Sequence, residues 1–189
     1  MLSSGQRGLM DSRGDDRLTR LVEQHAGAVG DYLRRRLFPL DGSDLDLLVA
    51  ETFVIVWRRI TVVPDGEGER PWIIGVARHV LQNAQRSTRR RRSYEDRVRS
   101  RMTAASAEEG VVARDRVRSA LARLSPADRE ILQLSAWDGL DATAIAAVLD
   151  ITTNAAAVRL SRATGRFRAA LEDPDTISVN RTGGGESDE

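Results

Sequence analysis

A segment near the C-terminus carries the residue types with which proteins contact DNA. Residues 153–171 contain four arginines and no acid, and small or polar side chains fill the first two turns. Arginine neutralises phosphates, and small side chains let a helix backbone approach base edges in the major groove. The candidate contacts are Asn154, Ala157, Val158, Arg159, Ser161, Arg162 and Arg166. An ordinary amphipathic helix with arginines for solubility is the alternative, and the lack of acids disfavours it.

A second basic group lies in the middle of the chain. Residues 86–101 hold eight arginines against two acids, a local net charge of +6. They continue the polar face of a predicted helix, where an imidazole and an amide accompany the arginines. These side chains suit phosphate contacts combined with contacts to base edges. The candidates are Arg78, His79, Asn83, Arg86, Arg89 and Arg90. A solvated basic linker is an equally good interpretation at this stage.

A third candidate surface is apolar. Leu47, Val54 and Ile55 lie outside the buried stripe of a predicted helix over residues 45–60, beside Asp44, Glu51 and Arg58. Exposed apolar side chains rimmed by charges indicate a protein-docking face. Packing of two of the three on the preceding helix is the alternative. Trp57 and Trp72 fall on apolar stripes, and we expect both in the core.

No set of residues points to catalysis. The chain has no cysteine and only two histidines, and no glycine-rich phosphate loop is present. Several acids share the helix over residues 45–60, but no histidine, lysine or metal-ligand set accompanies them. We therefore expect no enzymatic activity, no metal and no cofactor. We also expect a cytoplasmic protein, because neither a signal peptide nor a membrane-spanning run stands out. The net charge of +1 means that DNA binding would depend on where the charges lie.

Helical periodicity predicts the elements that position these groups, and no segment alternates as a strand would. In the first block, apolar stripes predict a helix from Leu18 to Leu33, a second over residues 45–60, and a third that begins at Pro71. Ser43 or Asp44 is placed to cap the second helix. Proline suits the start of the third because its missing N–H costs nothing there.

The second block predicts four shorter helices. Val117, Leu121 and Leu124 mark the first, and Ser125 followed by Pro126 is a strong start signal for the next. A short helix then leads through a tight turn at residues 150–152 into the basic helix. Two helices joined by a tight turn, the second of them basic, are typical of a helix-turn-helix.

The predicted fold is all-α, with two small helical domains joined by a flexible linker. We expect no regular structure over residues 1–15, a first domain over 16–95 and a linker over 96–113. The second domain covers residues 114–171, and the acidic, glycine-containing tail 172–189 is again expected to be disordered.

Three stretches in order resemble one family, the bacterial RNA polymerase sigma factors of the extracytoplasmic-function (ECF) class. SDLDLLVAETFVIVWRRI (43–60) resembles the part of region two that grips the polymerase clamp helices. RPWIIGVARHVLQNAQRSTRRRR (70–92) resembles the part that melts and reads the minus-ten element. The segment from LSPADREIL to RFRAAL (124–171) resembles region four, which binds the minus-thirty-five element and the beta-subunit flap.

The resemblance implies roles for individual residues. The residues that would bind polymerase are Asp44, Asp46, Leu47, Glu51, Val54 and Arg58. The arginine-rich set from Arg78 to Arg90 would contact the minus-ten element. The set from Asn154 to Arg166 would contact the minus-thirty-five element. His79 stands where the family most often has the asparagine implicated in capturing a flipped base. Ala157 and Val158 offer only apolar contacts, for instance to a thymine methyl.

Two further departures concern the backbone. Gly165 lies where the family has a basic residue and costs roughly 1 kcal/mol of helix stability. Asp150 replaces the glycine of the turn, a tolerable change because Asp enters the left-handed region more readily than most residues.

The resemblance implies a promoter-specificity factor with no cofactor. Its partners would be the beta-prime clamp helices and the beta flap of core polymerase, promoter DNA and an anti-sigma factor, without membrane insertion. One rival function is a stand-alone helix-turn-helix regulator, which would bind a palindromic operator without polymerase. Another is an adaptor that binds polymerase or an inhibitor but has lost DNA binding. Salt-dependent DNA binding separates the adaptor from the other two.

Overall fold

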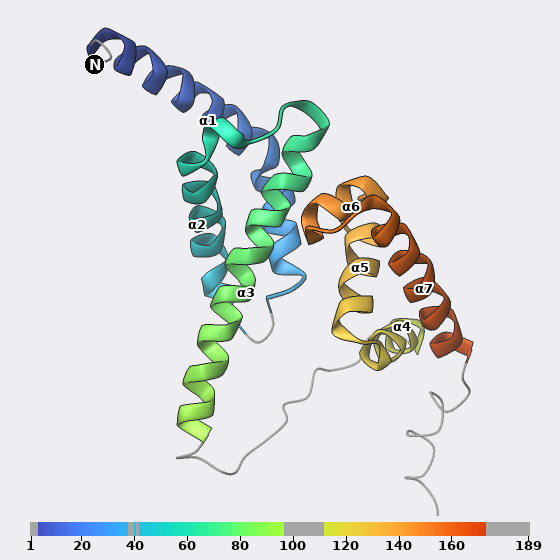
Figure 1. Ribbon diagram of the computed structural model, residues 1–189. Coiled ribbons are helices and arrows are strands. Elements are labelled where there is room, and N and C mark those ends of the chain that lie inside the picture. Colours follow the sequence, from blue (N-terminus) through green and yellow to red (C-terminus); the bar gives the residue numbers. More distant parts are fainter. Residues whose placement is uncertain (1–3, 38–39, 41, 97–111, 173–189) are drawn as a thin grey trace, which may run out of the picture. The chain divides into compact units, whose positions relative to one another are not determined.

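Figure 1 shows a computed structural model of the chain, in which every described element is a helix. It describes residues 4–37, 40, 42–96 and 112–172; the side chains of 4–12, 43, 89, 91–96 and 112–115 lie outside this description. The predicted all-α fold is confirmed within these ranges. Contacts group residues 1–102 with 143–152 in one compact unit and 103–142 with 153–189 in another. The predicted linker and acidic tail fall almost entirely outside the described residues.

Three long helices form the body of the first unit. They are α1 (Ser4–Arg34), α2 (Leu45–Arg58) and α3 (Glu69–Asp96), and each packs against the other two. Short 3-10 turns, η1 (Gly42–Asp44), η2 (Ile60–Val62) and η3 (Gly66–Gly68), lie in the connections. The predicted stripes meet in the core, whose buried members include Leu21, Val29, Leu33, Leu48, Phe53, Val56, Ile73, Ala77 and Val80.

Two of these helices are longer than their stripes predicted. Helix α1 begins at Ser4 and includes residues for which we expected no regular structure; no proline interrupts the chain before residue 39. Helix α3 begins at Glu69, so Pro71 stands inside its first turn, where an N–H has no partner within the helix. Its other end continues through the basic stretch to Asp96.

The expectation for Trp57 was wrong. Its side chain is 49% exposed, whereas that of Trp72 is half-buried. Trp57 lies at the edge of the α2 stripe, and periodicity locates the middle of a buried face better than its margins. The cap of α2 also differs from expectation: Asp44 occupies the N-cap position, but its side chain makes no capping hydrogen bond.

Arginines of α1 fasten it to the connection between α2 and α3. Arg17 donates hydrogen bonds to the carbonyls of Ile60 and Val63, both at 2.8 Å, and to the Asp65 carboxylate at 2.7 Å. One turn later, Arg20 donates to both carboxylate oxygens of Glu69, at 2.8 and 3.1 Å. Partners more than 40 residues apart thereby fix the place where α3 begins.

In the second unit, α7 (Thr153–Glu172) packs against α4 (Val112–Arg123) and α5 (Pro126–Ala136). The predicted start of α5 is confirmed: Ser125 is the N-cap, and its hydroxyl accepts a hydrogen bond from the Asp128 N–H at 3.1 Å. The predicted stripe of α4 is partly wrong, because Val117 is 43% exposed while Ala120 is fully buried.

Helix α6 (Ala142–Leu149) is short and apolar, and Ile145, Ala146 and Val148 are buried. Within the described residues, no helix is by itself long and apolar enough to span a membrane. Among the described helices, α6 and α7 have the length and composition of a span only when they are counted together, and the chain breaks between them at residues 150–152.

Candidate nucleic-acid interface

The turn that follows α6 has the local backbone geometry of the turn in a helix-turn-helix. Asp150 adopts φ +54°, which confirms that it takes the left-handed conformation of the turn. The Ile151 N–H donates to the Ala146 carbonyl at 3.1 Å, the six-to-one bond that closes a helix C-terminus around a left-handed residue.

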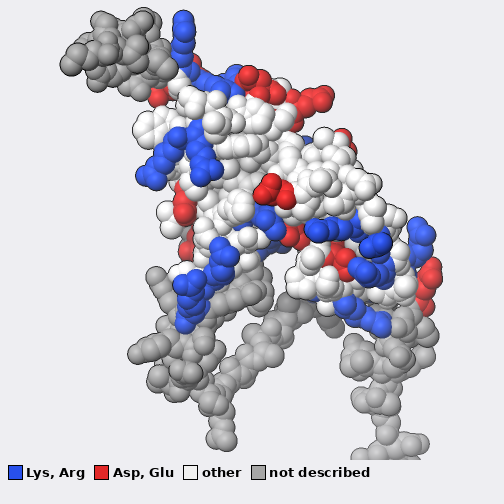
Figure 2. Space-filling model, in the orientation of Figure 1, with Lys and Arg blue, Asp and Glu red and all other residues white. Residues whose placement is uncertain are grey.

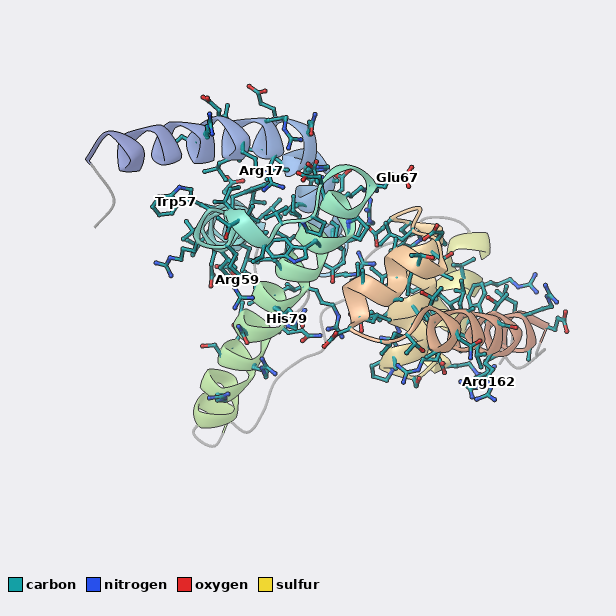
Figure 3. The ribbon with its side chains drawn as sticks, turned by 45° about the horizontal axis from the view of Figure 1, so that its top comes forward. Arg17, Trp57, Arg59, Glu67, His79 and Arg162 are labelled. Carbon is teal, nitrogen blue, oxygen red and sulfur yellow. The ribbon has the colours of Figure 1, made fainter. Side chains whose placement is uncertain are left out.

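The outward face of α7 carries the predicted contact residues. Ala156 and Ala163 are fully buried and fix which side of the helix faces the protein. All seven candidates, Asn154, Ala157, Val158, Arg159, Ser161, Arg162 and Arg166, are exposed. Figure 3 shows Arg162 projecting away from its unit, and Figure 2 shows basic side chains over this part of the surface, with a few acidic atoms among them. The small and polar side chains of the first two turns leave the backbone there accessible.

One of these arginines has an internal partner. Nη1 of Arg166 lies 2.8 Å from each carboxylate oxygen of Asp128, in the first turn of α5. The Asp128 side chain is 14% exposed and that of Arg166 is 59% exposed. Although the sequence of α7 before its last residue holds no acid, an acid from α5 therefore balances the charge of one of its arginines.

Two further arginines fix the helices of this unit. Arg129 on α5 donates to the carbonyls of Leu121, Ala122 and Leu124, at 2.9 to 3.2 Å, and so satisfies the C-terminal end of α4. Arg116 on α4 donates to the Leu171 carbonyl at 3.1 Å, near the end of α7. Sequence reasoning missed both roles, because an arginine that caps a helix elsewhere in the chain carries no local signal.

The second candidate surface lies along α3. His79, Asn83, Arg86 and Arg90 follow one another at helical spacing, and all four are exposed, whereas Arg78 is half-buried. Arg86 donates a hydrogen bond to the Asn83 side chain. A hollow of about 380 Å³ is lined by Asn83, Arg86, Ser87 and Arg90. The Arg89 side chain lies outside the description, and Figure 3 shows His79 on the ribbon of α3.

A buried charge cluster, missed at the sequence level, anchors the start of this helix. Glu69 is 5% exposed, and His25 Nε2 lies 3.3 Å from its Oε2 atom beside the Arg20 bonds. The hydrogen bonds from Arg20, and secondarily from His25, lower the pKa of Glu69 to about 2, although burial opposes the shift. Glu69 is therefore ionised at neutral pH and holds the first turn of α3 against α1.

The third candidate surface is the outer face of α2. Leu47, Val54 and Trp57 are 66%, 45% and 49% exposed, and Asp46, Glu51 and Arg58 are also exposed. Asp44 and Ile55 are half-buried. Figure 3 shows Trp57 projecting outward from α2. Of the three apolar residues predicted for this face, Leu47 and Val54 are exposed and Ile55 is only half-buried, and Trp57 adds a large aromatic side chain.

The residues that the structure describes hold no group of three or more His, Asp or Glu side chains placed to bind a metal.

Comparisons with known proteins agree with this arrangement. Residues 114–165 match the family model described as "Sigma-70, region 4". The chain is 29% identical over 157 residues to the ECF RNA polymerase sigma factor SigL of Mycobacterium tuberculosis, covering 81% of this chain and 88% of the relative. It is 26% identical over 160 residues to the RNA polymerase sigma factor NccH of Alcaligenes xylosoxydans xylosoxydans, covering 80% and 85%.

Solved structures extend the comparison to the fold. The chain is similar to CnrH in complex with the cytosolic domain of CnrY, with a TM-score of 0.53 and 25% identity, covering 82% of this chain and 86% of that one. The sigma factor RpoE in complex with the anti-sigma factor NepR, from Bartonella quintana, gives a TM-score of 0.55 at 19% identity, covering 85% and 97%. The chain belongs to the sigma-70 family, as an ECF sigma factor that directs promoter recognition by RNA polymerase.

Proposed function

We propose that the chain binds core RNA polymerase and opens promoters through three surfaces of different chemistry. Residues 16–95 would act as region two and residues 114–171 as region four. The outer face of α2 would contact the beta-prime clamp helices, α3 the minus-ten element, and α7 the minus-thirty-five duplex. Sigma factors are not enzymes, so the chemistry of RNA synthesis belongs to the polymerase. The protein would act in the cytoplasm, together with the polymerase and the promoter DNA.

The observation that carries the proposal is the surface of α7. A turn with Asp150 in the left-handed conformation precedes a helix whose buried side is alanine and whose outer side is small, polar and basic. Arg162 is exposed at the centre of this candidate interface. A bidentate arginine contact reads guanine, and apolar side chains such as Val158 meet thymine methyl groups. We therefore expect readout by a few direct contacts, supported by phosphate contacts from Arg159.

The exposed face of α3 supports a role at the minus-ten element. An imidazole and an amide, His79 and Asn83, lie four residues apart, with Arg86 and Arg90 one and two turns further along. Unstacked bases offer both a ring face and hydrogen-bonding edges, which an imidazole can contact in either way. The arginines would bind the backbone of the separated strand.

The outer face of α2 supports a protein partner. Three large apolar side chains of this face are exposed, and one of them is a tryptophan, a residue enriched among those that dominate binding energy at interfaces. Asp46, Glu51 and Arg58 would form the polar rim around Leu47, Val54 and Trp57. An anti-sigma factor would compete for polymerase-facing surfaces, a proposal favoured by the complexes in which CnrH and RpoE were solved.

Run-off transcription with core polymerase tests the proposal, with promoters taken from the neighbourhood of the chain's own gene. The wild-type chain should give specific initiation that is lost in both His79→Ala and Arg162→Ala. Tight duplex binding by the chain alone, without initiation, would instead favour the stand-alone regulator. Polymerase binding without initiation on any promoter would favour the adaptor.

A further inference from the structure

The pair between Asp128 and Arg166 joins the first turn of α5 to the basic side of α7. Arg166 lies four and seven residues after Arg162 and Arg159, so the three arginines share one flank of the helix. Of these three, Arg166 pairs with an acid: one nitrogen of its guanidinium lies 2.8 Å from each carboxylate oxygen of Asp128.

The surroundings of the carboxylate resemble those of an anion site. The start of a helix attracts negative charge, and Asp128 lies in the first turn of α5 after the Ser125 cap. A hollow of about 320 Å³ beside it is lined by Arg123, Ser125, Asp128 and Arg166, among others. A carboxylate and a phosphate oxygen accept hydrogen bonds from arginine in the same way.

We propose that Asp128 is an internal competitor for DNA phosphate, which withholds Arg166 from the duplex and so sharpens the specificity of α7. The inference rests on the proposed function, because it assumes that α7 meets duplex DNA. An arginine contact to phosphate raises affinity for every sequence alike, whereas base contacts discriminate between sequences. Pairing Arg166 internally lowers the sequence-independent part of binding and leaves the contacts of Arg162 and Val158 intact. Asp128 is thus a positioning residue, acting through Arg166.

The test is the salt dependence of binding to a short duplex of unrelated sequence, measured by fluorescence anisotropy with the full chain. Asp128→Asn removes the charge and keeps the shape. If the freed Arg166 binds one more phosphate, the plot of the logarithm of the binding constant against the logarithm of the salt concentration should become steeper by about 0.9. The affinity of the variant should then fall about 3.5-fold more than that of the wild type between 50 and 200 mM salt.

A double-mutant cycle separates this effect from loss of a negative charge alone. In an Arg166→Gln background, Asp128→Asn should change neither the slope nor the affinity. The matched control is Asp150→Asn, an exposed acid in the turn before α7 that tolerates asparagine at its positive φ. Circular dichroism reports whether each variant is folded.

Several outcomes would overturn the competitor role. One is that Asp128→Asn leaves the salt slope unchanged or weakens the affinity for the duplex. Another is that Asp150→Asn raises the affinity for the duplex by the same factor as Asp128→Asn. A third is that Asp128→Asn still raises the affinity in the Arg166→Gln background. Absence of duplex binding in every variant would also overturn it. Run-off transcription decides the proposed function separately, so that function can stand while the inference about Asp128 fails.

Discussion

Two pairs of arginines, one on α1 and one on α7, have opposite roles. On α1, Arg17 and Arg20 turn toward the protein, where carbonyl groups and the buried Glu69 carboxylate bind them. On α7, Arg159 and Arg162 project into solvent. The exposed surface of α2 is correspondingly apolar, whereas that of α7 is basic. Arginine content therefore says little about partners; the position of each guanidinium relative to the fold decides between a structural bond and a nucleic-acid contact.

The largest expected effect is on the buried Glu69 carboxylate of the first unit. Glu69→Gln should lower the free energy of unfolding by about 2 kcal/mol, because it removes the charge-assisted hydrogen bonds that this carboxylate accepts from Arg20 and His25. Urea unfolding followed by tryptophan fluorescence measures this. Asp128→Asn is the control from the second unit and should cost at most about 1 kcal/mol, since its partner Arg166 is largely exposed. If both variants lost the same free energy of unfolding, the ion pairs of Glu69 and Asp128 would not differ in their contribution to stability.

The same carboxylate predicts a pH dependence. Its pKa is lowered to about 2 in the folded chain, from an ordinary value of 4.5. The stabilisation is complete above the unfolded pKa and is lost as the pH falls from about 5 toward 2. Glu69→Gln has no carboxylate here to titrate, so its free energy of unfolding should lack this decrease. The free energies of unfolding of the wild type and the variant should therefore become nearly equal near pH 2. A constant difference between them from pH 7 to pH 2 would contradict the assignment.

The next effect tests the apolar surface of α2. Trp57→Ala should weaken binding to core polymerase about 30-fold, which corresponds to a loss of about 2 kcal/mol from an aromatic anchor. Surface plasmon resonance with immobilised polymerase measures it, in the absence of DNA. Arg162→Ala should bind polymerase as the wild type does. If Trp57→Ala also bound normally, the docking face would lie elsewhere.

A smaller effect is expected on the basic surface. Arg162→Ala should weaken promoter binding by the polymerase complex about tenfold, within the range of about 1–3 kcal/mol for a bidentate base contact. Arg162→Lys distinguishes two roles, because lysine replaces a phosphate contact but not the arginine fork. Full rescue by lysine would show that Arg162 binds backbone and does not read a base.

The smallest effect concerns the stability of α7. A Cβ atom on Gly165 would meet no heavy atom within 4 Å, so Gly165→Ala should raise the free energy of unfolding by up to about 1 kcal/mol. Ala169→Gly, at another exposed position of the same helix, should lower it by a similar amount. Thermal unfolding monitored by circular dichroism compares the two. A destabilised Gly165→Ala variant would mean that the position has a packing role.

Local signals were sufficient for part of this structure. The Ser125 cap, the left-handed Asp150 and the outward face of α7 all depend on neighbours within one or two turns, which the sequence displays directly. The exposure of Trp57 was mispredicted because the edge of an apolar stripe depends on how closely the adjacent helices approach.

Long-range pairs could not be predicted in the same way. Arg20 and Glu69 are 49 residues apart, and Arg166 and Asp128 are 38 apart. Any of the many arginines in the chain was an equally suitable partner for either acid before the helices were placed. The contrast between inward and outward arginines is therefore a property of the tertiary fold.

An ECF sigma factor recognises promoters as part of a polymerase complex. Binding of a labelled promoter duplex to this chain, measured with and without core polymerase, is therefore decisive. We expect weak, sequence-independent and salt-sensitive binding by the chain alone. Once polymerase is added, we expect tight sequence-specific binding, because the polymerase holds the two DNA-contacting surfaces at a fixed separation. Tight specific binding by the chain alone, unchanged by polymerase, would contradict this expectation.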